Sequence, residues 1–295
     1  MPQATAPRIF DRALMRARLA RAAATLAPGR DFLLVRAAED LADRLGTVKR
    51  GFARALDLGT PAAHFAQVLA ADPRIASALR AAPAFAPAAL VADAEAPPFA
   101  DASFDLIVSG LALHLVNDLP GALSHIRRAL RPDGLFLAAL PAGRTLQELR
   151  HALAAAEEEL SGGASPRVAP FADLRDLGSL LQRAGFALPV VDSDLVTVRH
   201  DSLFALMADL RGMGATSVLA QRSRKPATRA LFVRAAEIYA ERFADPDGRL
   251  RATFEIVWLS GWAPHESQQK PLKPGSARMR LADALGTSEI KATEI

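Results

Sequence analysis

Residues 56–64 read LDLGTPAAH. In this segment a short apolar run ends at residue 58, and Gly59 and several polar side chains follow it. A strand that ends at a glycine can turn sharply and let the backbone approach a nucleotide cofactor. Such loops usually carry further glycines. Here Pro61 removes a backbone donor, and Ala63 adds a methyl group where close approach is needed. The segment predicts either a cofactor loop built on Asp57, Gly59 and Thr60 or an ordinary strand-to-helix turn.

Two further positions place chemistry-bearing side chains after apolar runs. Asp93 and Ala94 follow residues 89–92, and a carboxylate there can accept hydrogen bonds from an adenine amine or a ribose hydroxyl. A turn-forming aspartate is the alternative. Ser109 and Leu111 lie near the end of residues 104–113, and His114 follows. This histidine is the catalytic candidate, with a structural histidine as the other interpretation.

Metal and cysteine chemistry have no support in the sequence. The histidines, at positions 64, 114, 125, 151, 200 and 265, do not have the spacing of zinc or non-haem iron ligands. The absence of cysteine excludes disulfides, thiolate nucleophiles and iron–sulfur ligation. Neither a GxSxG elbow nor a Walker loop occurs, so hydrolase, kinase and ATPase functions are not indicated.

Both tryptophans lie near the carboxyl end, where residues 258–269 read WLSGWAPHESQQ and a PGSA segment follows at 274–277. Aromatic and polar groups on a loop often form a binding surface. The alternative is a final strand whose aromatic side chains cover the core. The candidates for contact with a partner or substrate are Trp258, Trp262, His265, Glu266 and Gln268.

The elements that position these residues alternate in type. Apolar runs at 53–58, 89–92, 104–113 and 135–140 predict strands, and helices are expected from residue 64 and over 119–130. Continuous apolar strands between helices indicate a parallel sheet covered on both faces. The carboxyl ends of parallel strands meet at one edge, so the loops at Gly59, Asp93 and Ser109 should lie close together.

The rest of the chain is mostly helical. Helices are expected over 145–160, 171–184, 202–211 and 226–243, and strands over 190–198 and 253–262. The organisation predicted is a helical segment over 1–50, one α/β domain over 51–285 with helical insertions around 145–245, and a frayed tail over 286–295. The first helix carries several arginines, which form either a solvated face or a surface for an acidic partner.

Composition limits the kinds of partner. The chain has 36 basic and 32 acidic side chains, a net charge of +4, which is too small an excess to indicate nucleic-acid binding. No apolar stretch reaches the ~20 residues of a membrane span, and no secretory signal is visible. With 51% hydrophobic residues, the chain can bury a large core. A cytoplasmic globular protein is therefore expected.

Several segments together resemble the complex I assembly factor 5 family. They are IFDRAL near the amino end, FDLIVSGLALHLVNDLPGAL, DLRGMGATS at 209–217, and ATFEIVWLSGWAPHESQ with the PGSA that follows. The resemblance runs from about Ile9 to Leu285. It implies a class I S-adenosylmethionine methyltransferase fold, doubly wound and Rossmann-like, with a mostly parallel seven-stranded sheet. In mitochondria the family is assigned to complex I assembly and to hydroxylation of an arginine on a complex I subunit.

Carried onto this chain, the resemblance assigns a cofactor role to several candidate positions and also shows departures. Pro61 and Ala63 replace loop glycines, and the segment between Leu69 and Ala92 looks about one strand shorter than in relatives, with Asp72 as its only acid. Both departures are expected to weaken binding of S-adenosylmethionine, the predicted cofactor. The positions that match the family's cofactor site are Asp57, Gly59, Asp93, Ala94, Ser109, Leu111 and His114.

Two functions remain open at this point. One is an enzyme, either an S-adenosylmethionine-dependent methyltransferase or a hydroxylase of the same fold, that modifies a protein arginine of a complex I subunit. The other is a non-catalytic assembly chaperone that keeps the fold, has lost S-adenosylmethionine binding, and contacts its partner through the amino-terminal arginines or the tryptophan-containing carboxyl region.

Overall fold

The computed structural model describes residues 8–25, 27–269 and 286. Met1–Pro264 form one compact unit and His265–Ile295 form another, and each is described by itself. The PGSA segment at 274–277 and the tail expected over 286–295, apart from residue 286, lie outside the described residues. No described helix is long and apolar enough to cross a membrane.

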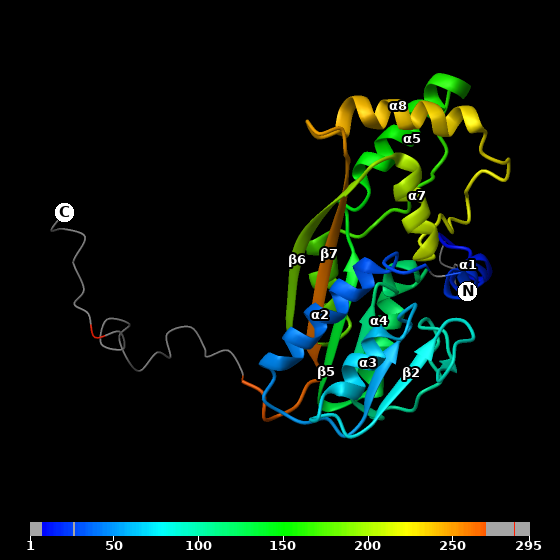
Figure 1. The fold of residues 1–295 in the computed structure, drawn as a ribbon. Helices are drawn as coiled ribbons and strands as arrows, with labels where there is room; N and C mark the ends of the chain where they lie inside the picture. Colours follow the sequence, from blue (N-terminus) through cyan, green and yellow to red (C-terminus); the bar gives the residue numbers. More distant parts are fainter. Residues whose placement is uncertain (1–7, 26, 270–285, 287–295) are drawn as a thin grey trace. The chain divides into compact units, whose positions relative to one another are not determined.

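The first unit is built on a seven-stranded sheet in the order β3-β2-β1-β4-β5-β7-β6 (Figure 1). Strands β1 to β5 pair in parallel, and β7 is antiparallel to both β5 and β6. The doubly wound, mostly parallel sheet predicted above is confirmed. Its strands are β1 (Ala55–Leu58), β2 (Ala78–Ala82), β3 (Leu90–Val91), β4 (Phe104–Gly110), β5 (Leu130–Pro141), β6 (Ala187–His200) and β7 (Leu250–Trp262).

The strands expected from apolar runs omit β2, which lies in the segment between Leu69 and Ala92. Its sequence, ALRAA, contains no β-branched or aromatic residue, so it carries no local strand signal. Pairing with β1 from Ala55↔Ala78 to Leu58↔Ala81 makes it a strand. The five-residue strand ends at Ala82, and Pro83 follows.

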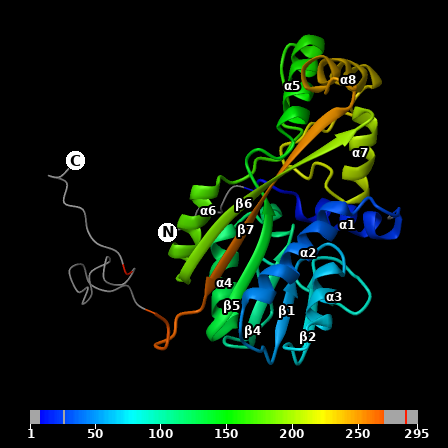
Figure 2. The same ribbon diagram turned by 60° about the vertical axis from the view of Figure 1, so that its left-hand side comes forward.

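Helices cover both faces of the sheet (Figure 2). Helices α2 and α3 pack on one face, and α4 and α6 pack on the other. The helices are α1 (Arg12–Thr25), α2 (Phe32–Thr47), α3 (His64–Ala71), α4 (Leu119–Ala129), α5 (Gln147–Ser161), α6 (Leu174–Arg183), α7 (Leu203–Gly212) and α8 (Arg229–Phe243), with a 3-10 turn over Leu113–Leu115.

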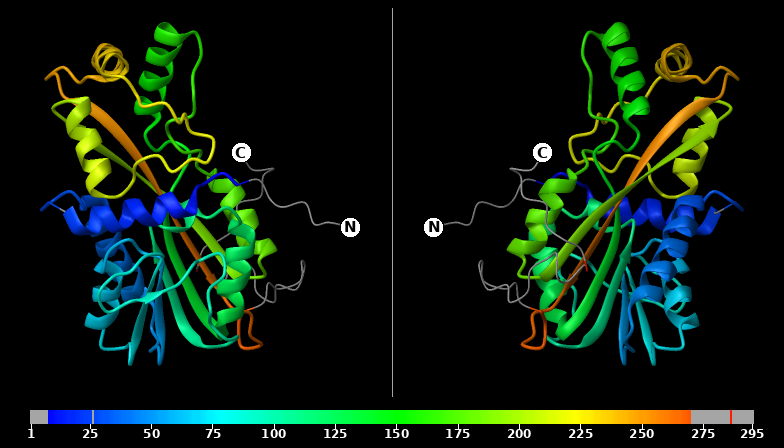
Figure 3. Two further views of the ribbon diagram at one scale, coloured as in Figure 1. Left: turned by 90° about the vertical axis from the view of Figure 1, so that its right-hand side faces the viewer. Right: turned by 90° about the vertical axis from the view of Figure 1, so that its left-hand side faces the viewer.

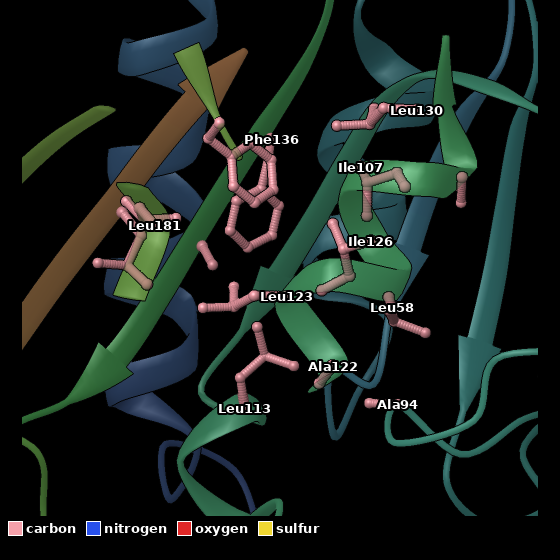
Figure 4. Close-up of a cluster of buried hydrophobic side chains, with 14 of the residues drawn as sticks. Leu58, Ala94, Ile107, Leu113, Ala122, Leu123, Ile126, Leu130, Phe136 and Leu181 are labelled. Atoms are coloured by element: carbon pink, nitrogen blue, oxygen red, sulfur yellow. The ribbon is translucent and has the colours of Figure 1, made fainter. Parts of the chain in front are cut away.

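The core beside α4 shows how the sequence fixes this packing. Apolar residues at positions 122, 123, 126 and 129 form one stripe of the helix, and all are buried. Figure 4 shows Leu123 and Ile126 directed toward strand side chains such as Phe136. The Asp118 side chain caps the helix by accepting a hydrogen bond from the Gly121 amide. Burial of a large apolar side chain such as Leu123 or Ile126 stabilises the fold by about 1.5–3 kcal/mol.

Helices α5, α7 and α8 form a separate apolar cluster on the part of β6 and β7 away from β5 (Figures 1 and 2). Leu206 of α7 and Ile238 of α8 are buried there against Phe254 of β7. The Tyr239 hydroxyl donates a 2.6 Å hydrogen bond to the Arg251 carbonyl. These helices are the insertions expected around residues 145–245.

Candidate functional site

A crevice lies where β1, β2 and β4 end, at the point where the strand order reverses between β1 and β4. Its floor includes Gly59 and Pro61 after β1, Pro83 after β2, and Ala94 and Leu111 on the neighbouring loops. The structure therefore brings together loops that are far apart in sequence, as the parallel strand pattern predicted. Leu111 has a φ of +48°, a strained value for a branched residue.

Gly59 makes the turn that shapes this crevice. Its φ of +81° lies in the left-handed region, and a Cβ there would be 3.3 Å from the Cβ of Ala112. Pro61 lines the crevice, but Ala63 does not, and it instead precedes α3 as the N-cap residue. The expectation that both substituted glycine positions crowd the crevice is correct only for Pro61.

Three of the predicted cofactor residues lie beneath the loop. Asp57, Thr60 and Ser109 are fully buried, and none lines the crevice. The Thr60 hydroxyl donates to Asp57 and accepts from the Gly110 amide at 2.9 Å, and the Ser109 hydroxyl donates to the Leu58 carbonyl at 2.7 Å. These side chains hold the loop in shape and are not placed to touch a ligand in the crevice.

Arg80 of β2 supports the same loop from below. It is buried, its Nε lies 3.9 Å from Asp57 Oδ2, and its Nη2 donates to the carbonyls of Thr60 and Pro61 at 3.4 Å. Burial raises the pKa of Asp57 to about 7, although the Thr60 hydroxyl and the Arg80 charge favour its ionised form. A buried Asp–Arg pair thus replaces solvent under the loop.

His114 lies at the boundary between the crevice and a larger cavity and lines both. Its Nδ1 is shielded from solvent and has no hydrogen-bond partner among the described residues. The ring packs 6.0 Å from that of Phe171. Burial lowers the pKa of His114 to about 4, so the imidazole is neutral at physiological pH and can accept a hydrogen bond.

Helix α1 covers the crevice. Arg12 and Arg16 of this helix each form an ion pair with Asp93, the latter at 2.7 Å. Partial burial opposes ionisation of this carboxyl, but the Glu95 amide and the two guanidinium groups hold the pKa of Asp93 below its ordinary value. Arg12 and Arg16 are therefore paired within the chain, which differs from both alternatives for these arginines, a solvated face and a surface for an acidic partner.

The covered crevice does not fit a nucleoside. Its volume is about 50 Å³, whereas small-molecule pockets usually span roughly 300–1,000 Å³. Met15 and Leu19 of α1 fill part of it, together with Met213 and the residues that follow. No carboxylate stands at the end of β2 to hold ribose hydroxyls, because Ala82 and Pro83 occupy that position.

The adjoining cavity has a volume of about 460 Å³, within the usual range for a ligand site. Its walls are mainly apolar and come from α1, α2, α5, α7 and β7. The buried Ser217 hydroxyl on its wall has no hydrogen-bond partner among the described residues. The charged residues that line it are Arg18, Asp31, Arg167, Arg211, Arg222 and Lys225.

Sequence reasoning missed the loop that closes the site, residues 213–218, although the DLRGMGATS motif marked it. Gly214 has a φ of +71°, and a Cβ there would lie 2.9 Å from Leu19 Cδ2. A side chain at this position would crowd the Leu19 side chain of α1. The Arg18 guanidinium also donates to the Ser217 carbonyl.

The carboxyl-terminal candidates separate into two groups. Trp258 is 1% exposed, stacks against Phe65 with ring centroids 6.3 Å apart, and lies under the Arg44 guanidinium. Trp262 pairs with Leu135 across β5 and β7, and Arg50 lies over its ring. Of the two alternatives for the tryptophans, the structure has the final strand, because both belong to β7, and Trp258 is too buried to contact a partner.

His265, Glu266 and Gln268 belong to the segment after Pro264. All three lie in a local turn in which the His265 amide donates to Gln268 Oε1 at 3.2 Å and the His265 ring contacts the Ser267 hydroxyl at 2.7 Å. Their role in binding a partner stays a prediction. Within residues 8–25, 27–269 and 286, no group of three or more histidine, aspartate or glutamate side chains is placed to hold a metal ion.

The sheet order and the crevice at its switch point define a class I methyltransferase fold. The family described as "Methyltransferase domain" matches residues 49–138. A putative methyltransferase from Bacillus halodurans shares the fold, with a TM-score of 0.52 and 16% identity over 77% of this chain and 98% of that one. The YcgJ protein from Bacillus subtilis also shares the fold, with a TM-score of 0.51 and 16% identity over 78% of this chain and 99% of that one.

The chain belongs to the family of the arginine-hydroxylase NDUFAF5. It is 39% identical to the mitochondrial protein of that name from Danio rerio, over 93% of this chain and 89% of the relative. The Homo sapiens protein of the same name is also 39% identical, over 95% of this chain and 85% of the relative. A malonyl-[acyl-carrier protein] O-methyltransferase from Laribacter hongkongensis is 34% identical over 90% and 94%.

The cytoplasmic location expected from the sequence is wrong on this comparison, because the NDUFAF5 relatives are named as mitochondrial proteins. The expectation rested on the absence of an apolar leader. That feature does not distinguish these compartments, since mitochondrial targeting segments are amphipathic and arginine-rich rather than apolar.

Proposed function

We propose that this chain modifies a protein side chain, an arginine of a complex I subunit, at the junction between the cavity and the crevice. The observation that supports this function is that the two spaces share lining residues, among them Pro61, Leu111 and His114. A side chain held in the cavity would therefore meet a group in the crevice at His114. The arginine target comes from the name of the relatives at 39% identity.

His114 is the residue best placed to act on such a substrate. The imidazole is neutral at pH 7, and its Nδ1, which has no hydrogen-bond partner among the described residues, can accept a hydrogen bond. The strained turn at Leu111 lies in the same shared wall. These properties suit a neutral hydrogen-bond acceptor that positions a bound side chain.

S-adenosylmethionine is the cofactor proposed for the crevice, in a conformation with α1 displaced. The fold and the Gly59 turn favour this group, whereas the 50 Å³ volume and the missing carboxylate after β2 oppose it while α1 is in place. The buried Asp57, Thr60 and Ser109 would support the loop, not contact the cofactor.

A carboxylate-bearing substrate is a second candidate, because cations dominate the charged lining of the cavity. Five basic residues face one acid, Asp31, whose carboxylate lies 3.0 Å from His64 Nε2. Arg167 is neutralised by Glu157, but Arg18 and Arg211 have no carboxylate within ion-pair distance among the described residues. A relative named as a malonyl-[acyl-carrier protein] O-methyltransferase is consistent with such a substrate.

Mass spectrometry of complex I subunits from a deletion strain decides between these functions. Loss of a single-oxygen or a methyl mass from one arginine, restored by the parent gene and not by His114→Gln, would support arginine modification. Loss of a methyl ester from a carboxylate would favour the second candidate. Unchanged subunit masses together with defective complex I assembly would overturn both and leave the assembly chaperone.

A further inference from the structure

Helix α1 occupies the place that a ligand of the crevice would take. Arg12 and Arg16 hold both carboxylate oxygens of Asp93, and Arg12 also donates to the Leu115 carbonyl at 2.9 Å. Asp93 follows β3 at the edge where open α/β sheets bind their ligands. The carboxylate best placed to receive a nucleoside is therefore already neutralised from within the chain.

The apolar residues on the same face of α1 pack against the crevice and the loop at residues 213–218. Figure 3 shows α1 crossing between the β1–β5 part of the sheet and α7. Leu19 and Ala22 pack where Gly214 has no side chain, and Met15 and Leu19 line the crevice. The Asp11 amide donates to the Val218 carbonyl at 2.8 Å and anchors the start of the helix.

The hold of α1 on the body is limited. Of its fourteen residues only Met15 and Ala22 are buried. Arg16 is 46% exposed and Asp93 is 24% exposed, so solvent screens that ion pair. A helix with few buried apolar contacts opens more readily than one packed in the core. Its closed position is a state that a ligand or partner can shift.

We propose that α1 is a latch that competes with the nucleoside for Asp93 and the crevice, so that the nucleoside binds only when Arg12 and Arg16 release Asp93. This inference rests on the proposed function for its ligand. The apparent affinity of the protein for the nucleoside is then set by the fraction of molecules in which α1 is released. Releasing the latch tightens binding without changing any residue on the crevice floor.

The test compares the parent with Arg12→Ala/Arg16→Ala and with Arg21→Ala, an exposed arginine of the same helix. S-adenosylhomocysteine is the probe for calorimetry, and hydrogen exchange of the α1 amides reports release independently of any ligand. The double variant should exchange faster in α1 and bind the probe at least tenfold more tightly than the parent. Arg21→Ala should match the parent in both measurements.

A reversible lock makes the test independent of the ion pairs. The chain has no cysteine, and the Ala22 Cβ lies 3.4 Å from the position of a Gly214 Cβ, so Ala22→Cys/Gly214→Cys can form a disulfide between α1 and the loop. Added to the double variant, the disulfide should abolish probe binding when oxidised and restore it when reduced.

Two results would overturn the latch. One is equal probe binding in the oxidised and reduced forms. The other is faster exchange of α1 in the double variant with no gain in binding. In the second case the mass-spectrometric result for arginine still decides the proposed function separately, because it does not depend on this probe.

Discussion

At the scale of single residues, position relative to the strand ends separates the predicted cofactor positions into two groups, because Asp57 and Ser109 lie within β1 and β4 whereas Gly59 and Leu111 follow them. Gly59, Ala94 and Leu111 face the crevice, whereas Asp57 and Ser109 point into the protein. The motif marked the correct loop, but not which side chains meet a ligand. Asp57 is fully buried and accepts a hydrogen bond from the Thr60 hydroxyl, so this acid holds the loop and does not touch the crevice.

His114 should make stability depend on pH. Its folded pKa of about 4 lies below the ordinary 6.5, so the unfolded chain binds a proton first as the pH falls. Its contribution is fully present above about pH 6.5 and is lost progressively toward pH 4. Between pH 7 and 5, we expect the parent to lose about 1–2 kcal/mol more stability than His114→Gln.

Urea unfolding at the two pH values measures this difference. The control is His125→Gln, which changes an exposed histidine of α4 and should keep the pH dependence of the parent. The same slope in the parent and His114→Gln would show that the imidazole is hydrated and not held neutral by burial.

At the scale of elements, α1 illustrates a helix whose position is decided by distant partners. Its apolar stripe is imperfect, and its arginines look solvated from the sequence. In the structure two of them reach Asp93, which is 81 and 77 residues away. Such pairs leave no local pattern, because the contact joins segments that only the tertiary fold brings together.

Gly214→Ala should destabilise the α1 contact beyond the cost of its backbone conformation. Gly248→Ala is the matched control, since φ is +82° there and open space surrounds it, compared with +71° and the Leu19 contact at Gly214. Both variants lose about 1–2 kcal/mol from the left-handed conformation. Only Gly214→Ala should also speed hydrogen exchange in α1. Equal exchange in both variants would contradict tight docking of α1 on this loop.

At the scale of the whole molecule, β7 joins the three main apolar clusters. Phe254 packs with α5, α7 and α8, Trp258 with α2 and α3, and Leu259 with α4 and α6. One strand thus carries side chains of every layer, so the inserted helices are not an independent body. We expect the first unit to unfold in one cooperative step.

Leu206→Ala in the helical cluster tests this expectation. The unfolding transitions seen in the near-ultraviolet signal of the two tryptophans and in the far-ultraviolet helical signal should shift together to lower denaturant concentration. We expect the free energy of unfolding to fall by about 2–5 kcal/mol. Phe204→Ala, an exposed change on the same helix, should leave both near the parent values. Loss of helical signal before the tryptophan signal would show that the inserted helices unfold separately.

The sequence by itself determined the alternation of strands and helices, the sheet edge with Gly59, and the family, because apolar runs and motifs are local properties of the chain. It missed β2, since ALRAA becomes a strand only through pairing with β1. It left Trp258 open between core and surface. Only the tertiary structure decided that α1 covers the crevice, that Asp93 is paired and that the large cavity exists, because these depend on contacts between distant segments.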